Sequence, residues 1–171
     1  MNLSKLSDWE LLKRHAKLDV ELEEELHRRK ILRTANNLIG DIAEHLFCTA
    51  CKWERVCNSQ AGFDAIGKTN GKHYQIKARR IIRDNSNSRQ LSAIRGLKEP
   101  KHFDFLAGVL FNEDYSVYKA ALIPYKVVLK LAKPDKHVNG HRFLLRNDIW
   151  DAKWKAEGVV DKTAQLQSKW H

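Results

Sequence analysis

Residues 62–80 read GFDAIGKTNGKHYQIKARR and predict two β-strands joined by a tight turn. Apolar and polar residues alternate before Lys68, in F-D-A-I-G, and after Lys72, in H-Y-Q-I-K-A-R. Alternation with period two is typical of strands that bury one face. Between them lies Asn70-Gly71, the dipeptide that best tolerates the positive φ angles of a two-residue type I′ turn. We therefore expect a β-hairpin that folds back at these two residues.

A two-residue turn at this position fixes which residues of the hairpin face each other. The predicted pairs are Asp64 with Lys77, Ile66 with Gln75, Ala65 with Ile76, and Phe63 with Ala78. Residues directly opposite in an antiparallel pair have Cβ atoms about 4.5–5.5 Å apart. One face of the hairpin should thus be apolar, whereas the other gathers a carboxylate, an amide and an amine.

This cluster resembles the active site of the PD-(D/E)xK nucleases, the restriction-endonuclease-like superfamily. Members carry an acid on one strand, acid-x-Lys on the next, and often a glutamate on the preceding helix. The matching positions here are Asp64, Gln75-Ile76-Lys77 and Glu44. Phe63 stands where the family commonly has proline, and Gln75 stands where it usually has a carboxylate. A few members of the superfamily use Gln-x-Lys, so the sequence resembles that variant.

The resemblance implies an α/β fold with a restriction-endonuclease-like core, in which helices flank a central mixed β-sheet. Residues 1–171 would form a single nuclease-like domain, with an N-terminal helical segment at about 1–33 and a C-terminal extension at about 135–171. Restriction-type enzymes of this size usually act as dimers that cut both strands. The resemblance therefore also implies a homodimer.

The same resemblance implies a Mg²⁺-dependent endonuclease that hydrolyses phosphodiester bonds in DNA, with Mn²⁺ as an alternative ion. Asp64, Gln75, the backbone carbonyl of Ile76 and Glu44 would be the metal ligands, because Mg²⁺ prefers oxygen donors. Lys77 would hold or deprotonate the attacking water, or bind the scissile phosphate. Because Gln75 removes a negative charge, the alternative is a catalytically inactive nucleic-acid-binding module on the same fold. A third alternative is a structural subunit whose basic face docks an acidic protein.

The charge of the chain independently favours a polyanionic partner. The net charge is +10, and residues 64–101 hold ten basic residues against three acidic ones. Lysine and arginine contacts to phosphate supply most sequence-independent affinity for nucleic acid. The predicted nucleic-acid contacts are Lys72, Arg79, Arg80, Arg83, Arg89 and Arg95.

Composition restricts the cell compartment and the class of protein. The 171 residues, 43% hydrophobic and 30% charged, suit one globular domain. No apolar run approaches the ~20 residues that span a bilayer, and the N-terminus lacks the apolar stretch of a secretory signal. Three cysteines argue against a disulfide framework. We expect a soluble, cytoplasmic protein.

Two helices are expected before the hairpin. Ser7 and Glu10 form a capping box that starts a helix suited to packing or dimerisation, and a second helix should run from Asn36 or Asn37 to about Cys51. Glu44 lies roughly 150° from the apolar stripe of this second helix at ~100° per residue, which indicates a solvent-facing side chain. The alternative is a functional role, favoured by the family position and by Gly40, whose missing side chain admits a backbone or a phosphate.

The rest of the chain should complete the sheet and its covering helices. The predicted elements are a helix at 90–97, strands at 103–111 and 117–123, a helix at 124–132, a hairpin turn at Asn139-Gly140, a strand at 143–145 and a short terminal helix at 163–171. His45, Cys48, Cys51 and Cys57 have tolerable zinc-ligand spacing, but packing is the favoured interpretation of these residues.

Overall fold

The computed structural model describes residues 2–34, 37–56, 62–82, 89–97, 101–137 and 139–169. The helices are α1 (Asp8–Arg28), α2 (Leu38–Cys51), α3 (Tyr125–Leu131), α4 (Ala152–Ala156) and α5 (Thr163–Gln167), with 3-10 turns η1 (Leu3–Lys5) and η2 (Asn147–Trp150). The strands are β1 (Trp53–Arg55), β2 (Ala65–Gly67), β3 (His73–Arg80), β4 (Phe105–Phe111), β5 (Val117–Pro124), β6 (Lys133–Asp135), β7 (Gly140–Arg142) and β8 (Val160–Asp161).

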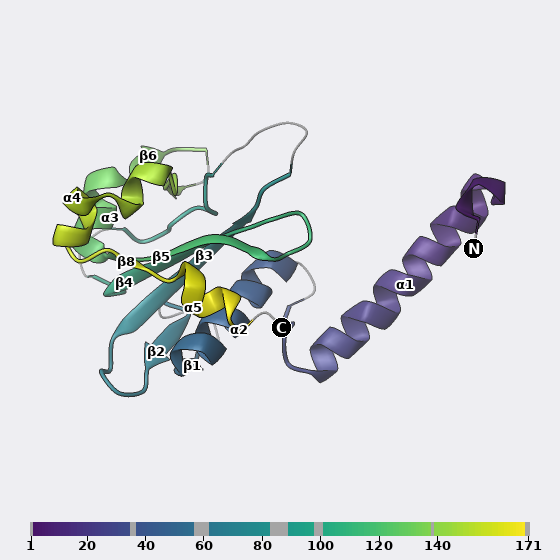
Figure 1. Ribbon diagram of the computed structural model, residues 1–171, viewed down its shortest axis with the longest axis horizontal. Helices are drawn as coiled ribbons and strands as arrows, with labels where there is room; N and C mark the ends of the chain where they lie inside the picture. Colours follow the sequence, from purple (N-terminus) through teal and green to yellow (C-terminus); the bar gives the residue numbers. More distant parts are fainter. Residues whose placement is uncertain are drawn as a thin grey trace.

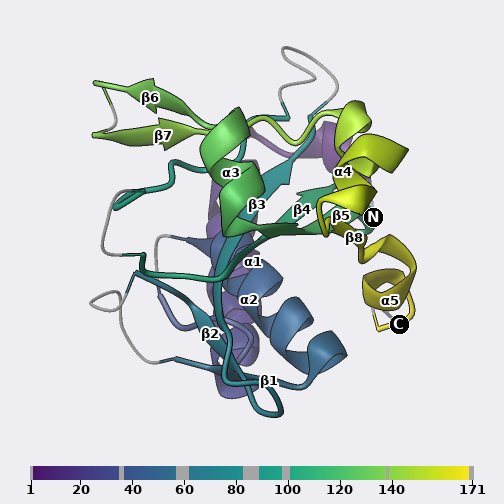
Figure 2. The same ribbon diagram turned by 90° about the vertical axis from the view of Figure 1, so that its left-hand side faces the viewer.

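A twisted sheet in the order β1-β2-β3-β4-β5-β8 forms the centre of the molecule (Figure 1). β3 and β4 are parallel, and the other described pairs of this sheet are antiparallel. β6 and β7 form a separate two-stranded ribbon that extends from the body (Figure 2). The predicted α/β class, with a central mixed sheet flanked by helices, is confirmed.

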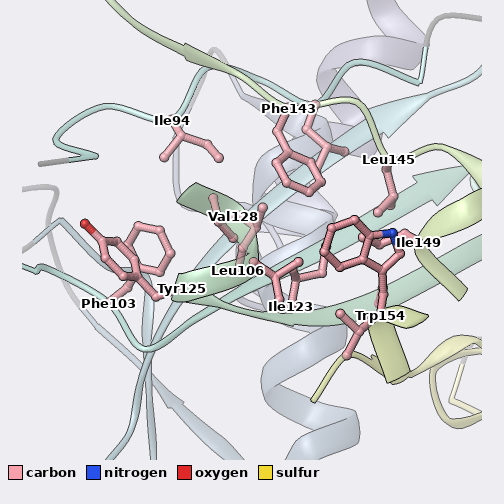
Figure 3. Packing of buried hydrophobic residues seen from close by; sticks show 14 of the residues in the cluster. Ile94, Phe103, Leu106, Ile123, Tyr125, Val128, Phe143, Leu145, Ile149 and Trp154 are labelled. Atoms are coloured by element: carbon pink, nitrogen blue, oxygen red, sulfur yellow. The ribbon is translucent and has the colours of Figure 1, made fainter. Parts of the chain in front are cut away.

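Each face of the sheet carries its own hydrophobic core. On one face α2 and α5 pack over the strands, and the buried side chains there include Phe47, Ala65, Tyr74 and Ile76. On the other face residues 89–97, α3, η2 and α4 supply the cover. Figure 3 shows this second core, with labelled residues Ile94, Phe103, Leu106, Ile123, Tyr125, Val128, Phe143, Leu145, Ile149 and Trp154. The open edge of β3 lies between the two covers.

The start of α2 is built by a side-chain cap. Asn37 is the N-cap, and its Oδ1 accepts a hydrogen bond from the backbone N–H of Gly40. A Cβ at position 40 would overlap the Asn37 side chain, so glycine is required there by the cap itself. The Asn37 side chain thus occupies the space that a side chain at position 40 would need, and the approach of a phosphate or another backbone to Gly40 stays a prediction.

The hairpin forms, but in a different register from the predicted one. Ala65 pairs with Tyr74 and Ile66 with His73, so the connection spans residues 68–71 rather than two residues. The side chain of Asn70 explains the longer turn, because its Oδ1 accepts the N–H of Lys72 at 3.0 Å. Asp64 precedes β2, and its backbone N–H donates to the carbonyl of Tyr74, so it does not lie opposite Lys77. The register shifts by two residues, so the predicted faces of β3 are kept.

Two further predictions about this half of the chain are wrong. Phe63 lies on the polar side of the hairpin, where its ring stacks on His73 at 4.0 Å between centroids. Residues 90–97 are extended instead of helical, with bridges from Gln90 to Leu144 and from Ile94 to His141. The strand predicted at 143–145 is reduced to the bridge at Leu144.

The remaining elements follow the predictions closely. The capping box of Ser7 and Glu10 begins α1, and the expected strands and helix correspond to β4, β5 and α3. Asn139 lies in the β6–β7 connection, Gly140 begins β7, and α5 occupies the predicted terminal helix. Within the described ranges, no helix is both long enough and apolar enough to cross a bilayer.

Candidate functional site

A cleft of about 600 Å³ opens along the edge of β3, beyond the point where β2 stops pairing with it. Its walls are the first turns of α2, the chain before α2, and residues around Asp64 and Ser92. The lining residues are Arg33, Thr34, Asn37, Ile39, Gly40, Asp41, Glu44, Val56, Phe63, Asp64, Ile76, Lys77, Ala78, Arg79 and Ser92. Three predicted catalytic side chains, Glu44, Asp64 and Lys77, therefore share one cleft.

Asp64 is fixed at this edge by two hydrogen bonds to β3. Its backbone N–H donates to the carbonyl of Tyr74 at 2.8 Å, and its Oδ2 accepts from the N–H of Ile76 at 2.6 Å. In a strand the N–H and C=O of one residue point to the same edge. The carbonyl of Ile76 consequently points to the edge on which the Asp64 carboxylate lies, and Lys77 follows directly in the chain. Asp64, Ile76 and Lys77 all line the cleft.

Gln75, next to Ile76 in β3, is more deeply buried than Glu44 and Lys77. It is only 6% exposed and does not line the cleft. Its Nε2 donates to the carbonyl of Gly62 at 3.4 Å, while its Oε1 is buried without a hydrogen-bond partner. An unpaired buried acceptor costs about 1–3 kcal/mol. The amide oxygen of Gln75 is therefore a buried acceptor that no group of the described residues satisfies.

Glu44 is partly buried and belongs to a charge network on the wall of the cleft. Its Oε2 accepts from Arg55 Nε at 2.7 Å and lies 3.9 Å from Arg33 Nη1. Arg55 Nη2 also contacts Asp41 Oδ1 at 2.6 Å, so one guanidinium bridges two acids of α2. The solvent-facing interpretation of Glu44 is wrong, because 19% of its side chain is exposed and it points into this network.

The pKa values of the two acids, Glu44 and Asp41, are shifted in opposite directions. Burial raises the pKa of Glu44, and the nearby Asp64 charge adds to that effect, although the hydrogen bond from Arg55 opposes it. Burial also acts to raise the pKa of Asp41, but hydrogen bonds from Arg33 N–H and Thr34 outweigh it and leave that pKa lowered. Asp41 is thus held as a carboxylate, whereas Glu44 is the acid of the cleft that takes up a proton more readily.

The predicted nucleic-acid contacts are not gathered in one place. Arg79 lines the cleft and is exposed, and Arg95 is exposed on the segment that contributes Ser92. The other positions hold protein contacts: Lys72 lies 3.8 Å from Asp104, Arg80 donates to Tyr115 Oη at 2.6 Å, and Arg89 lies over the Tyr118 ring. Arg83 lies outside the described residues.

Sequence reasoning missed three charged residues of the site, Arg33, Asp41 and Arg55. Asp41 accepts the N–H groups of Arg33 and Thr34 through Oδ2, which holds the chain before α2 against the cleft. The available signal was the spacing of Asp41 and Glu44, since acids three residues apart share a helix face. No pattern in the neighbouring sequence indicates that Arg55, on strand β1, contacts both Asp41 and Glu44.

The donor atoms fit a hard divalent cation better than they fit zinc. Among the described residues, no three His, Cys, Asp or Glu side chains are grouped for metal binding. Burial raises the pKa of the Cys48 thiol to about 12, which opposes formation of the thiolate ligand that zinc prefers. Cys57 of that alternative lies outside the described residues. Mg²⁺ keeps several waters and needs only one or two carboxylates, and the Asp64 carboxylate, the Ile76 carbonyl and the unpaired Gln75 Oε1 are all oxygen donors.

Comparisons with known proteins add limited information. No protein-family model matches the chain. No curated protein matches it either. Twelve chains of solved structures are similar. One is the bacterial homing endonuclease I-Ssp6803I, at 18% identity and a TM-score of 0.46 over 80% of this chain and 94% of that chain.

Proposed function

We propose that the protein is a Mg²⁺-dependent endonuclease of the PD-(D/E)xK type that hydrolyses phosphodiester bonds in DNA. One observation carries the proposal: the Asp64 carboxylate is hydrogen-bonded to the N–H of Ile76 at an open strand edge, and Lys77 lines the same cleft. Phosphodiester hydrolysis needs a positioned water and compensation of the charge that develops on the phosphate oxygens. An acid, a carbonyl and an amine in one cleft would meet both needs.

Asp64, the Ile76 carbonyl and Gln75 Oε1 would hold Mg²⁺ or Mn²⁺. Glu44 would contribute through Oε1, because its contacts with Arg33 and Arg55 both use Oε2. When bound, the ion supplies Lewis acidity that lowers the pKa of water and offsets charge on the phosphate. This assignment is supported by Gln75 Oε1, a buried acceptor that has no hydrogen-bond partner among the described residues.

The chain's own residues position the reactants. Lys77 would hold the attacking water beside the phosphate, and Arg79 would contact a neighbouring phosphate from the rim of the cleft. The reaction forms a bond between the water oxygen and phosphorus and breaks the bond to one sugar oxygen, which takes up a proton. Arg33 and Arg55 hold Glu44 in place rather than contacting DNA.

A nucleic-acid-binding module without catalysis is the second candidate. It is favoured by the neutral amide at position 75 and by the pairing of Glu44 with Arg55, since both reduce the negative charge available to a cation. The exposed Arg79, which lines the cleft, would serve DNA binding in either case. Cleavage and binding must therefore be measured separately.

Plasmid cleavage tests the proposal most directly. The wild-type protein should convert supercoiled plasmid to nicked or linear product with Mg²⁺ or Mn²⁺, and EDTA should stop the reaction. Lys77→Ala should reduce the rate at least 100-fold, in line with the ~10²–10⁴ that a positioned proton-transfer group contributes. Its retardation of DNA in a gel should change little. Lys126→Ala, an exposed lysine on α3 that does not line the cleft, is the matched control.

Several plasmids of different sequence are needed, because a strict recognition site would hide activity on one of them. Binding without any metal-dependent cleavage would replace the nuclease with the binding module. Equal cleavage by wild type and Lys77→Ala would show that the activity does not come from this cleft.

A further inference from the structure

Helix α1 is the part of the molecule that the cleft does not explain. It is 21 residues long, or about 30 Å at 1.5 Å per residue, and none of its residues is buried. Figure 1 shows it extending away from the sheet and its covering helices. Most helical stability in proteins comes from packing one face against a partner. An isolated helix of this length therefore calls for a partner that covers it.

The apolar side chains of α1 lie on one side of the helix, where they are interspersed with Asp8, His15, Asp19, Glu23 and His27. At ~100° per residue they span an arc of about 200°. The arc consists of Trp9, Leu11, Leu12, Ala16, Leu18, Val20, Leu22 and Leu26. Leu12 is 61% exposed, Leu18 54% and Leu22 52%. Large apolar side chains that are exposed along several turns of one helix face indicate an interaction site.

The charges beside this arc are separated along the helix. Lys13, Arg14 and Lys17 lie in its N-terminal half, whereas the following residues 19–25 contain five acids. At ~100° per residue, Lys13 and Glu24 border one flank of the arc, and Arg14 and Glu21 border the other. Each flank is thus basic toward the N-terminus and acidic toward the C-terminus.

We propose that α1 pairs in an antiparallel orientation with α1 of a second copy of this chain. Antiparallel pairing about a two-fold axis sets the basic half of each helix against the acidic half of the other, on both flanks of the apolar arc. Parallel pairing would set five acids against five acids, and like charges in contact destabilise an interface. Charge complementarity therefore selects both the partner and the orientation.

A lipid surface fits the charges of α1 less well than a second copy of the helix does. Helices that lie on anionic lipid carry basic residues along their whole polar border, and the acids at 19–25 would repel that surface over half the length of α1. The inference concerns α1 alone and does not depend on the nuclease proposal.

Charge reversal in the full-length protein tests the pairing. Wild-type protein should have twice the chain mass of 19.9 kDa by light scattering. Lys13→Glu/Arg14→Glu should have the mass of one chain, because acids then face acids. Glu21→Lys/Glu24→Lys should do the same, because basic residues then face each other. The variant that combines all four substitutions should recover the doubled mass, which excludes simple loss of the helix. An equimolar mixture of the two single-group variants should also form a dimer.

A wild-type protein that has the mass of one chain at all concentrations would overturn the proposal. So would a dimer that persists in both single-group variants, since its interface would lie elsewhere. If the monomeric protein instead co-sediments with phosphatidylserine vesicles, the apolar arc is assigned to lipid. Circular dichroism of each variant checks that the helix content is retained.

Discussion

Arg55 determines the electrostatics of the cleft wall at the scale of single residues. Its guanidinium contacts Asp41 and Glu44 at 2.6 and 2.7 Å, and only 13% of its side chain is exposed. Charges this poorly solvated interact more strongly than surface pairs. Burial raises the pKa of Glu44 although Arg55 opposes it, whereas hydrogen bonds from the Arg33 N–H and from Thr34 outweigh burial and hold Asp41 ionised.

Replacing Asp41 should destabilise the fold in a pH-dependent way. The folded-state pKa of Asp41 lies below its ordinary value of 3.8, so its contribution is present above pH 3.8 and is lost as the pH falls through the folded-state pKa. Asp41→Asn should lower the free energy of unfolding by about 3 kcal/mol at pH 7, the cost of breaking a buried pair. Urea denaturation at pH 7 and pH 3 measures this. The difference from wild type should shrink at pH 3, and the exposed Asp148→Asn should show neither effect.

Gln75 offers a second test at this scale. Gln75→Glu adds a carboxylate at a position that is 6% exposed, which should lower the melting temperature in the absence of metal, because burying a charge is costly. If the amide oxygen belongs to a cation site, Mn²⁺ should bind the variant about tenfold more tightly than wild type and raise its melting temperature further. Calorimetric titration with MnCl₂ measures the affinity. Equal affinities would separate Gln75 from the metal, and Gln165→Glu is the exposed control.

Part of the site could be predicted from single residues and part could not. The Asp64, Gln75 and Lys77 pattern is local in sequence, and the structure brings Asp64 and Lys77 to one cleft. Arg55 contacts residues 11 and 14 positions earlier across the end of α2, and no local period encodes that distance. The charge network therefore depends on the packing of α2 against β1, which the sequence alone does not specify.

Among the secondary-structure elements, the connection between β2 and β3 is the most readily tested. Gly71 has φ of +62°, and a Cβ there would meet nothing within 4 Å, so any cost of substitution comes from the backbone. Gly71→Ala should destabilise the protein by about 1–2 kcal/mol, the cost of a left-handed conformation for an ordinary residue. Gly71→Asn should cost less, because asparagine tolerates this region. Chemical denaturation of both variants measures the difference, and equal losses would contradict the conformational explanation.

The same hairpin explains what periodicity can and cannot predict. Alternation identifies which residues share a face, and that assignment holds for Tyr74, Ile76 and Ala78. It does not specify register, because a shift of two residues returns every side chain to the same face. The register depended on the hydrogen bond from Lys72 N–H to Asn70 Oδ1, which favours a four-residue connection over a two-residue one.

Residues 90–97 show how tertiary pairing overrides local spacing. Leu91, Ile94 and Leu97 recur every third residue, which is compatible with a helix, yet all three are buried by an extended chain. Ile94 exchanges two backbone hydrogen bonds with His141, at 3.0 and 2.8 Å. That partner lies 47 residues further along the chain, so its influence cannot be derived from the segment itself.

At the scale of the whole molecule, the two ends of the chain contribute differently to the hydrophobic cores. α1 contributes nothing to either hydrophobic core, whereas Trp150, Trp154 and Leu166 from the C-terminal part are buried in them. The body of the protein is thus completed by residues from the end of the chain. The N-terminal helix is left to interact with something else, consistent with the pairing proposed for it.

The net charge of +10 makes a further prediction about binding as a whole. If the cleft binds duplex DNA, the association constant should fall steeply with salt, because each neutralised phosphate contributes about −0.9 to the slope of log K against log salt concentration. Arg79 and Arg95 are both exposed, and Arg79 lines the cleft. Arg79→Ala/Arg95→Ala should reduce the magnitude of that slope by about 2. Lys126→Ala/Lys155→Ala removes the same charge from α3 and α4 and should leave the slope nearly unchanged. Fluorescence anisotropy over a range of salt concentrations measures the slope. Identical reductions in both double variants would show that DNA binding depends on the total charge of the protein and not on this cleft.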